Sequence, residues 1–273
     1  MLLLALVGSL PGGPASALPG PPGPPPAAPR APARALPAAP PLVVLDPGHG
    51  GSNEGARTGG GVLEKELTGQ ITARVRRLLE EQTGVRVALT REQDTYLGLR
   101  ERAELANRLG AALLLSIHGN SAPHDRARGH ETFFLSPAGA ARLASPEPDP
   151  TLAAAVPSGA SEAAAVAAIT TELRTTATQR QSERLALLVQ QELNRRLVGP
   201  SRGVRQATFD VLLHATVPAA VVEVGFLNHP IEGPLLATPA YQERIAAALA
   251  AAICRFLEVD RLPAARAGRP GAS

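Results

Sequence analysis

The sequence predicts an α/β protein, a single domain of three α/β/α layers around a mainly parallel, twisted sheet. Three observations predict this fold. Apolar runs of strand length alternate with segments of helical periodicity. Turns rich in Gly and Pro separate several of them. The runs LVVLDPGHG, ALLLSIHGN and AAVVEVGFL each have, at or near the strand end, a residue that an apolar strand has little reason to carry, namely His49, His118 and Glu223. Open α/β sheets place their active sites at the edge where the carboxyl ends of such strands meet.

The first half of the domain alternates strands and helices. Leu67, Ile71 and Val75 share one face of the first helix, which begins near Glu64 and ends at Gly84. The elements predicted here are a strand at 42–45, that helix, a strand at 85–90, a helix at 99–109 and a strand at 111–117. This order is typical of right-handed βαβ units.

The second half is less regular, because a stretch rich in Pro, Ala and Ser interrupts it at 136–160. Ser182 is a plausible N-cap, so we expect a new helix to begin there. The elements predicted here are a strand at 130–135, a weakly amphipathic helix at 162–179, a helix from Ser182 to 197, a strand at 219–224 and a helix at 240–257.

The ends of the chain differ in composition from the predicted domain at 42–262. Residues 1–17 hold a short apolar run and an A-x-A site, which predict a signal peptide although no basic residue precedes the run. Residues 18–41 are mostly Pro, Ala and Gly and predict a disordered linker, and residues 263–273 a disordered tail. We therefore expect an exported protein without a stable membrane span.

Composition excludes some functions. The formal net charge is +3 and aromatic residues make up 3% of the chain, so a nucleic-acid platform of basic and stacking residues is not expected. The single cysteine, Cys254, cannot form an internal disulfide and is expected to be a buried thiol. We expect a monomer.

Four residues are candidates for a catalytic metal site. His49 and His118 follow strands, Glu64 opens a helix, and Glu223 interrupts a buried strand, where a carboxylate needs a partner or a raised pKa. Each has an ordinary alternative: a loop histidine, a core histidine, a helix-dipole carboxylate, and an ion pair with an arginine. Together, two imidazoles, a carboxylate ligand and a spare glutamate fit a zinc hydrolase.

Several motifs resemble one family along the whole domain. The strings VVLDPGHGGSNEGA, LEKELT, LANRLGAALLLSIHGNSA, GHETFFLS and PAAVVEVGFLNHP are similar to the zinc-dependent N-acetylmuramoyl-L-alanine amidases, also called amidase type 3. One departure is His229, which follows GFLN where family members usually show asparagine. His124, His130 and His214 match no ligand position.

The resemblance implies a phosphorylase/hydrolase-like fold that binds one Zn²⁺ through His49, Glu64 and His118, with Glu223 as general base and acid. The substrate would be the peptidoglycan amide between the lactyl group of N-acetylmuramic acid and L-alanine. Two further roles are proposed for Asn120, Arg205 and Asp46, although local hydrogen bonding in a turn, or a solvated charge, is the simpler explanation of each residue. Asn120 or Arg205 would contact substrate, and Asp46 would orient a ligand histidine.

In some relatives an inserted helix covers the metal until an activator protein removes it. Residues 136–181 are of suitable composition for such a lid, and Glu172 is the better candidate for an occluding ligand, although an ordinary surface helix explains the segment equally well. The resemblance implies that the enzyme acts in wall remodelling or in the separation of daughter cells. It would do so in the periplasm, or else in an extracellular cell wall. A zinc carboxypeptidase and a non-catalytic wall-binding scaffold are the alternatives.

Overall fold

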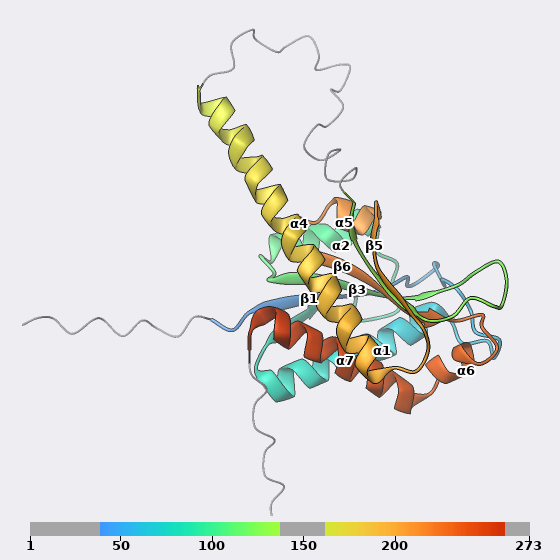
Figure 1. Ribbon diagram of the computed structural model, residues 1–273. Coiled ribbons are helices and arrows are strands. Elements are labelled where there is room, and N and C mark those ends of the chain that lie inside the picture. The colour runs from blue at the N-terminus through green and yellow to red at the C-terminus, as the bar shows by residue number, and fades with distance from the viewer. Residues whose placement is uncertain (1–38, 137–161, 260–273) are drawn as a thin grey trace, which may run out of the picture. The chain divides into compact units, whose positions relative to one another are not determined.

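The computed structural model describes residues 39–136 and 162–259 (Figure 1). The predicted signal peptide, the tail, most of the linker and residues 137–161 of the insert lie outside the described residues. The elements are β1 (Leu42–Pro47), α1 (Glu64–Thr83), β2 (Arg86–Leu89), α2 (Leu99–Arg108), β3 (Leu113–Asn120), β4 (His130–Leu135), α4 (Glu162–Arg196), β5 (Ser201–Ala207), α5 (Asp210–Leu213), β6 (Ala219–Phe226), α6 (Glu232–Leu236) and α7 (Pro239–Leu257).

One six-stranded sheet, in the order β2-β1-β3-β6-β4-β5, forms the centre. β2, β1, β3 and β6 run parallel to one another, whereas β4 is antiparallel to β6 and β5 is parallel to β4. The prediction of a mainly parallel sheet is confirmed. The carboxyl ends of β1, β3 and β6 therefore meet at one edge, where the amino end of β4 also lies.

Helices cover both faces of the sheet, as predicted. α1, α4 and α7 pack on one face, against residues such as Leu45 and Leu115, and α2 and α5 pack on the other, against Val44 and Leu114. Successive strand residues alternate between these two clusters because side chains of a strand point to opposite faces. α7 is rich in alanine and packs closely on α1 and α4, with Cys254 buried as expected.

Most predicted helix and strand ends agree with the structure to within a few residues. Gly84 ends α1 in the left-handed conformation, at φ 69°, as a C-cap glycine does. Thr238 caps α7 by accepting a hydrogen bond from the Tyr241 N–H, and Pro239 begins the helix. The glycine signal at the end of α1 was therefore reliable, and the predicted start of α7 at residue 240 lies one residue from the observed start.

The prediction of two helices between 162 and 197 was wrong, because α4 is one continuous helix of 35 residues. Ser182 lies inside it rather than at an N-cap. Its hydroxyl donates to the carbonyl of Thr178, one turn earlier, and accepts a hydrogen bond from the N–H of Ala219 in β6. A buried serine that joins a helix to a strand thus resembled a helix start in the sequence.

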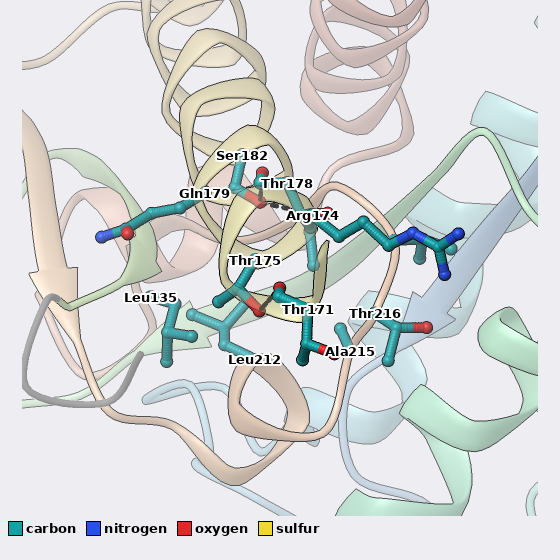
Figure 2. Close-up of a pocket in the computed structure, with 12 residues that line it drawn as sticks. Leu135, Thr171, Arg174, Thr175, Thr178, Gln179, Ser182, Leu212, Ala215 and Thr216 are labelled. Atoms are coloured by element: carbon teal, nitrogen blue, oxygen red, sulfur yellow. Dashed lines mark hydrogen bonds between the residues drawn. The ribbon is translucent and has the colours of Figure 1, made fainter. Parts of the chain in front are cut away.

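A cavity of about 500 Å³ lies between the first half of α4, α5 and the amino end of β6 (Figure 2). Thr171, Thr175 and Thr178 of α4 line it, together with Leu212 and Ala219. It lies at the end of β6 opposite to Glu223. No helix among the residues described here is long and apolar enough to cross a membrane.

Candidate metal centre and active site

Three side chains from separate elements converge at the carboxyl edge of the sheet. His49 follows β1, Glu64 is the first residue of α1, and His118 lies in β3. The Oε1 atom of Glu64 is 2.9 Å from Nε2 of His49 and 3.1 Å from Nδ1 of His118. One donor atom from each residue lies within 4.8 Å of the other two, so the three can hold one metal ion.

Glu64 is buried, and hydrogen bonds from two backbone N–H groups fix the orientation of its carboxylate. Oε2 accepts a hydrogen bond from the N–H of Ala56 at 2.8 Å, and Oε1 accepts one from the N–H of Gly119 at 3.1 Å. Burial by itself would raise the pKa of Glu64. The hydrogen bonds and charges of His118 and His49 outweigh burial and hold that pKa well below its usual range. Glu64 is therefore an ionised carboxylate.

The ring of His49 is oriented by Asn53, a residue that the sequence analysis did not single out. Nδ1 of His49 lies 2.8 Å from Oδ1 of Asn53. A proton on Nδ1 leaves the lone pair of Nε2 facing the donor atoms of Glu64 and His118, which together with His49 are called the metal group below. His49 also has a φ of 59°, an uncommon backbone conformation for a residue other than glycine. Strained residues of this kind cluster at functional sites.

Two buried arginines hold the backbone of the loop that carries His49. Arg91 donates to the carbonyls of Pro47, Gly48 and His49 at 2.9–3.1 Å, and Arg102 donates to those of Pro47 and His49 at 2.9 and 2.8 Å. All three consecutive carbonyl groups are thus fixed by guanidinium groups. This contact network stabilises the left-handed conformation of His49.

Asp46 contributes to the site through Arg102. Its carboxylate accepts hydrogen bonds from Arg102 at 2.8 Å, from Ser116 at 2.6 Å and from Thr90 at 2.5 Å. These three contacts use both carboxylate oxygens and involve no histidine ring. The orienting role predicted for Asp46 would therefore act through Arg102 and the backbone of the His49 loop.

We expect Arg102→Gln to lower the free energy of unfolding by about 3–5 kcal/mol, because it leaves Asp46 buried without its charge partner. Arg100→Gln is the matched control. Arg100 pairs with Glu104 at 2.7 Å but is largely exposed, so its loss should cost less than about 1 kcal/mol. Denaturant titration of both variants measures the difference, and equal losses would contradict the role given to Arg102.

Glycines allow the ligands to pack against the loop. A Cβ on Gly48 would lie 2.4–2.6 Å from ring atoms of His118, closer than real Cβ atoms approach. A Cβ on Gly55, whose φ is 70°, would lie 2.6 Å from Oε2 of Glu64 and 2.7 Å from the ring of His49. Both positions therefore require glycine for steric reasons.

Glu223 lies beside the metal group, in β6. It is paired with His118 in the β3–β6 register and with Glu131 in the β4–β6 register. Burial raises the pKa of Glu223 to about 7; the charges of Glu64 and Glu131 act in the same direction and those of His118 and His49 oppose them. Its Oε2 has no hydrogen-bond partner in the described part of the chain. A buried carboxyl with a free oxygen can exchange a proton with a bound molecule.

A cleft of about 490 Å³ opens onto these residues. Its floor carries His49, His118 and Glu223, and its walls come from the segments before α2 and around α5. Tyr96 and Phe209 line it and remain 61% and 39% exposed. The cleft thus joins the metal group and the free carboxyl to a partly apolar surface that a substrate can reach.

The structure brings Asn120 and Arg205 together at Glu131, another residue that the sequence analysis did not single out. The amide of Asn120 donates to Oε1 of Glu131 at 2.8 Å, and Nε of Arg205 lies 3.0 Å from Oε2. Nε of Arg202 lies 3.2 Å from Oε1. Glu131 is buried and is paired with Glu223 in the β4–β6 register, so this cluster lies next to Glu223 at the sheet edge.

The remaining histidines lie elsewhere, as expected from their lack of a family match. His130 contacts Asn194 at 2.8 Å, and Nδ1 of His229 accepts hydrogen bonds from the N–H groups of Ile231 and Glu232 at the start of α6. The metal group of His49, Glu64 and His118 includes none of the other histidines in the described residues.

Glu172 is exposed in the first half of α4 and is not part of the metal group. Its neighbour Thr171 lines the cavity at the opposite end of β6 (Figure 2). Occlusion of the metal by Glu172 would require this half of α4 to move, so its regulatory role stays a prediction. If Glu172 occludes the metal, Glu172→Ala raises basal wall hydrolysis in a peptidoglycan assay. Unchanged hydrolysis by the folded variant would contradict that role.

Comparisons with known proteins agree with this geometry. A family model described as N-acetylmuramoyl-L-alanine amidase matches residues 43–255. The chain is 30% identical to the germination-specific N-acetylmuramoyl-L-alanine amidase of Bacillus subtilis, over 81% of this chain and 82% of the relative. Among solved structures, it is similar to the amidase AmiC2 of Nostoc punctiforme, with 29% identity, a TM-score of 0.62, and coverage of 80% of this chain and 97% of the other.

A second solved structure is the CwlD amidase of Clostridioides difficile in complex with the GerS lipoprotein. It is 25% identical, with a TM-score of 0.61 and coverage of 80% of this chain and 99% of the other. The family match extends from β1 to near the end of α7 and includes the His49, Glu64 and His118 group and Glu223. The chain belongs to the N-acetylmuramoyl-L-alanine amidase family.

Proposed function

We propose that this protein hydrolyses the peptidoglycan amide that joins the lactyl group of N-acetylmuramic acid to L-alanine, with one zinc ion bound by His49, Glu64 and His118. The observation that carries the proposal is the convergence of these three donors beside Glu223 in an open cleft. Membership of the amidase family supports the choice of bond. The intact donors and free carboxyl count against a non-catalytic scaffold.

The donor set fits zinc. It consists of two imidazole nitrogens and one carboxylate oxygen, whereas Mg²⁺ and Ca²⁺ prefer oxygen ligands. Three protein ligands are the usual number in a catalytic zinc site, since the fourth position is left for water or substrate. Asn53, Ala56 and Gly119 hold His49 and Glu64 in place, as the outer contacts of metal ligands do.

When bound, zinc supplies a Lewis acid that polarises the amide carbonyl and lowers the pKa of water. Glu223 performs the proton transfers. Its ionised carboxylate takes a proton from the attacking water as the new C–O bond forms. It then gives that proton to the nitrogen of L-alanine as the C–N bond breaks. The pKa of about 7 suits a group that must both accept and donate a proton near neutral pH.

We further propose that the protein acts outside the cytoplasm, in the periplasm or else in an extracellular wall, during wall remodelling or daughter-cell separation. The predicted signal peptide and linker support export. The lipoprotein complex of the CwlD amidase supports the idea that a partner protein can control such a domain. An activator of this chain would act on the access of peptidoglycan to the cleft.

The direct test is digestion of purified peptidoglycan by the full chain, with and without zinc, followed by mass spectrometry of the products. An amidase releases intact stem peptides that begin with a free L-alanine amine, and glycan strands whose lactyl groups end in carboxylates. Release only after zinc is added back to chelated protein is the expected result.

A zinc carboxypeptidase would instead release single amino acids from the carboxyl end of the stem. Products of that kind, or amidase products at the full rate from zinc-free protein, would contradict the proposal.

A further inference from the structure

We propose that Arg205, balanced on Glu131, is a binding site for the free α-carboxylate of the second residue of the peptide stem. This inference rests on the proposed function, because it concerns the substrate of the same cleft. Arg205 would make the amidase prefer peptide stems whose second residue has a free α-carboxylate. Stems in which this carboxylate is converted to an amide would bind less well.

The strand register places the residues concerned in one row across the sheet. His118 of β3 is paired with Glu223 of β6, and Glu223 is paired with Glu131 of β4. Arg205 of β5 is paired with Phe133, two residues after Glu131 on β4. Paired residues, and residues two apart on one strand, point to the same face. The row therefore leads from the metal group through Glu223 to the arginine.

Two positively charged groups meet a single carboxylate at Glu131. Arg202 and Arg205 each carry one positive charge, and both contact the single carboxylate of Glu131, whose remaining partner, Asn120, is neutral. At Glu131 itself the arginines therefore exceed the carboxylates by one, and Glu223 is a further carboxylate of the row. The excess positive charge at Glu131 favours an anionic group on the exposed side of Arg205.

The guanidinium group of Arg205 is free to bind such a group. The side chain of Arg205 is 52% exposed, whereas that of Glu131 is 4% exposed. The buried carboxylate therefore contacts the guanidinium group on its protein side and leaves its other side open to solvent. The contact between Arg205 and Glu131 at 3.0 Å lacks hydrogen-bond geometry, since Oε2 of Glu131 has no hydrogen-bond partner in the described ranges. The N–H groups of Arg205 therefore remain available for a bidentate contact with a carboxylate.

The spacing suits the second residue of the stem. Adjacent strands are about 4.8 Å apart, so the backbone at Glu131 is that far from the backbone at Glu223, where the amide is cut. An extended chain advances about 3.5 Å per residue. The α-carboxylate one residue after L-alanine can therefore reach the guanidinium group that Glu131 anchors, while the scissile amide stays at Glu223.

The test uses two synthetic N-acetylmuramoyl tetrapeptides that differ only at the second residue, D-glutamate with either a free α-carboxylate or an α-carboxamide. We expect wild-type, zinc-loaded protein to show a kcat/KM about tenfold higher for the carboxylate, mainly through KM, as a charge-assisted hydrogen bond predicts. In Arg205→Gln the ratio falls to about one. Arg180→Gln, which removes an exposed arginine of α4, keeps the wild-type ratio.

Dissociation constants of both compounds, measured with zinc-loaded Glu223→Gln protein, make the test independent of turnover. Cleavage of both compounds at equal efficiency, or a ratio that Arg205→Gln does not change, would overturn the subsite and leave the amidase function intact. If neither compound is cut, the proposed function fails. The binding ratio then still decides: a tenfold preference supports the subsite, and equal affinities overturn it.

Discussion

Replacing Glu223 by Gln lowers kcat for wall hydrolysis by roughly 100- to 10,000-fold, which is the usual contribution of a general acid–base group. The amide of Gln keeps the shape of the side chain but cannot accept a proton from water. Because Glu223 is separate from the three metal donors, zinc content and folding should stay as in the wild type. Initial rates on purified peptidoglycan, with metal analysis of the same samples, measure both quantities.

The control for this variant is Glu104→Gln, which changes a partly exposed glutamate of α2 whose contacts are salt bridges to Arg100 and Arg108. It should hydrolyse peptidoglycan at the wild-type rate. A zinc-loaded Glu223→Gln protein with full activity would show that another group transfers the proton, and the proposed mechanism would then be wrong.

Replacing Gly48 by Ala should weaken zinc binding and activity by about 10- to 100-fold, the size of effect seen when residues that orient metal ligands are changed. The new methyl group would overlap ring atoms of His118, at 2.4–2.6 Å, so the imidazole must leave its position. Competition with a chelator of known zinc affinity measures the dissociation constant.

Gly59→Ala is the matched control, because a Cβ on Gly59 meets no heavy atom within 4 Å. Its zinc affinity and activity should equal those of the wild type. Equal zinc affinity in Gly48→Ala would mean that His118 does not need its observed position, and it would count against His118 as a ligand.

The sequence predicted the elements whose signals are local. β1, β3 and β6 are apolar runs, and α1 and α7 have apolar residues at helical spacing. β5 was not predicted, because Ser201–Ala207 is a half-exposed edge strand whose sequence SRGVRQA has no apolar alternation. α5 and α6 have four and five residues, too few for a periodic pattern. The sequence predicted two helices in place of α4, because Ser182 is a common N-cap residue type and only the structure shows that it is buried inside one helix.

His49, Glu64, His118 and Glu223 could be proposed as one site because each follows, begins or interrupts a recognisable element and because the motifs around them resemble one family. Glu131 could not, since its importance depends on its register with Glu223 and on two arginines from β5. Asn53 could not be assigned for a similar reason: its contact with His49 depends on the turn between them. A role that depends on strand register or on the conformation of a loop cannot be predicted from the sequence of residues alone.

The most direct measurement is a crystal structure of the zinc-soaked protein with anomalous data collected at the zinc absorption edge. The proposed centre predicts one peak about 2 Å from Nε2 of His49, Oε1 of Glu64 and Nδ1 of His118, with Glu223 outside the coordination sphere. A peak bound by other residues, or protein that hydrolyses peptidoglycan without any peak at this group, would contradict it.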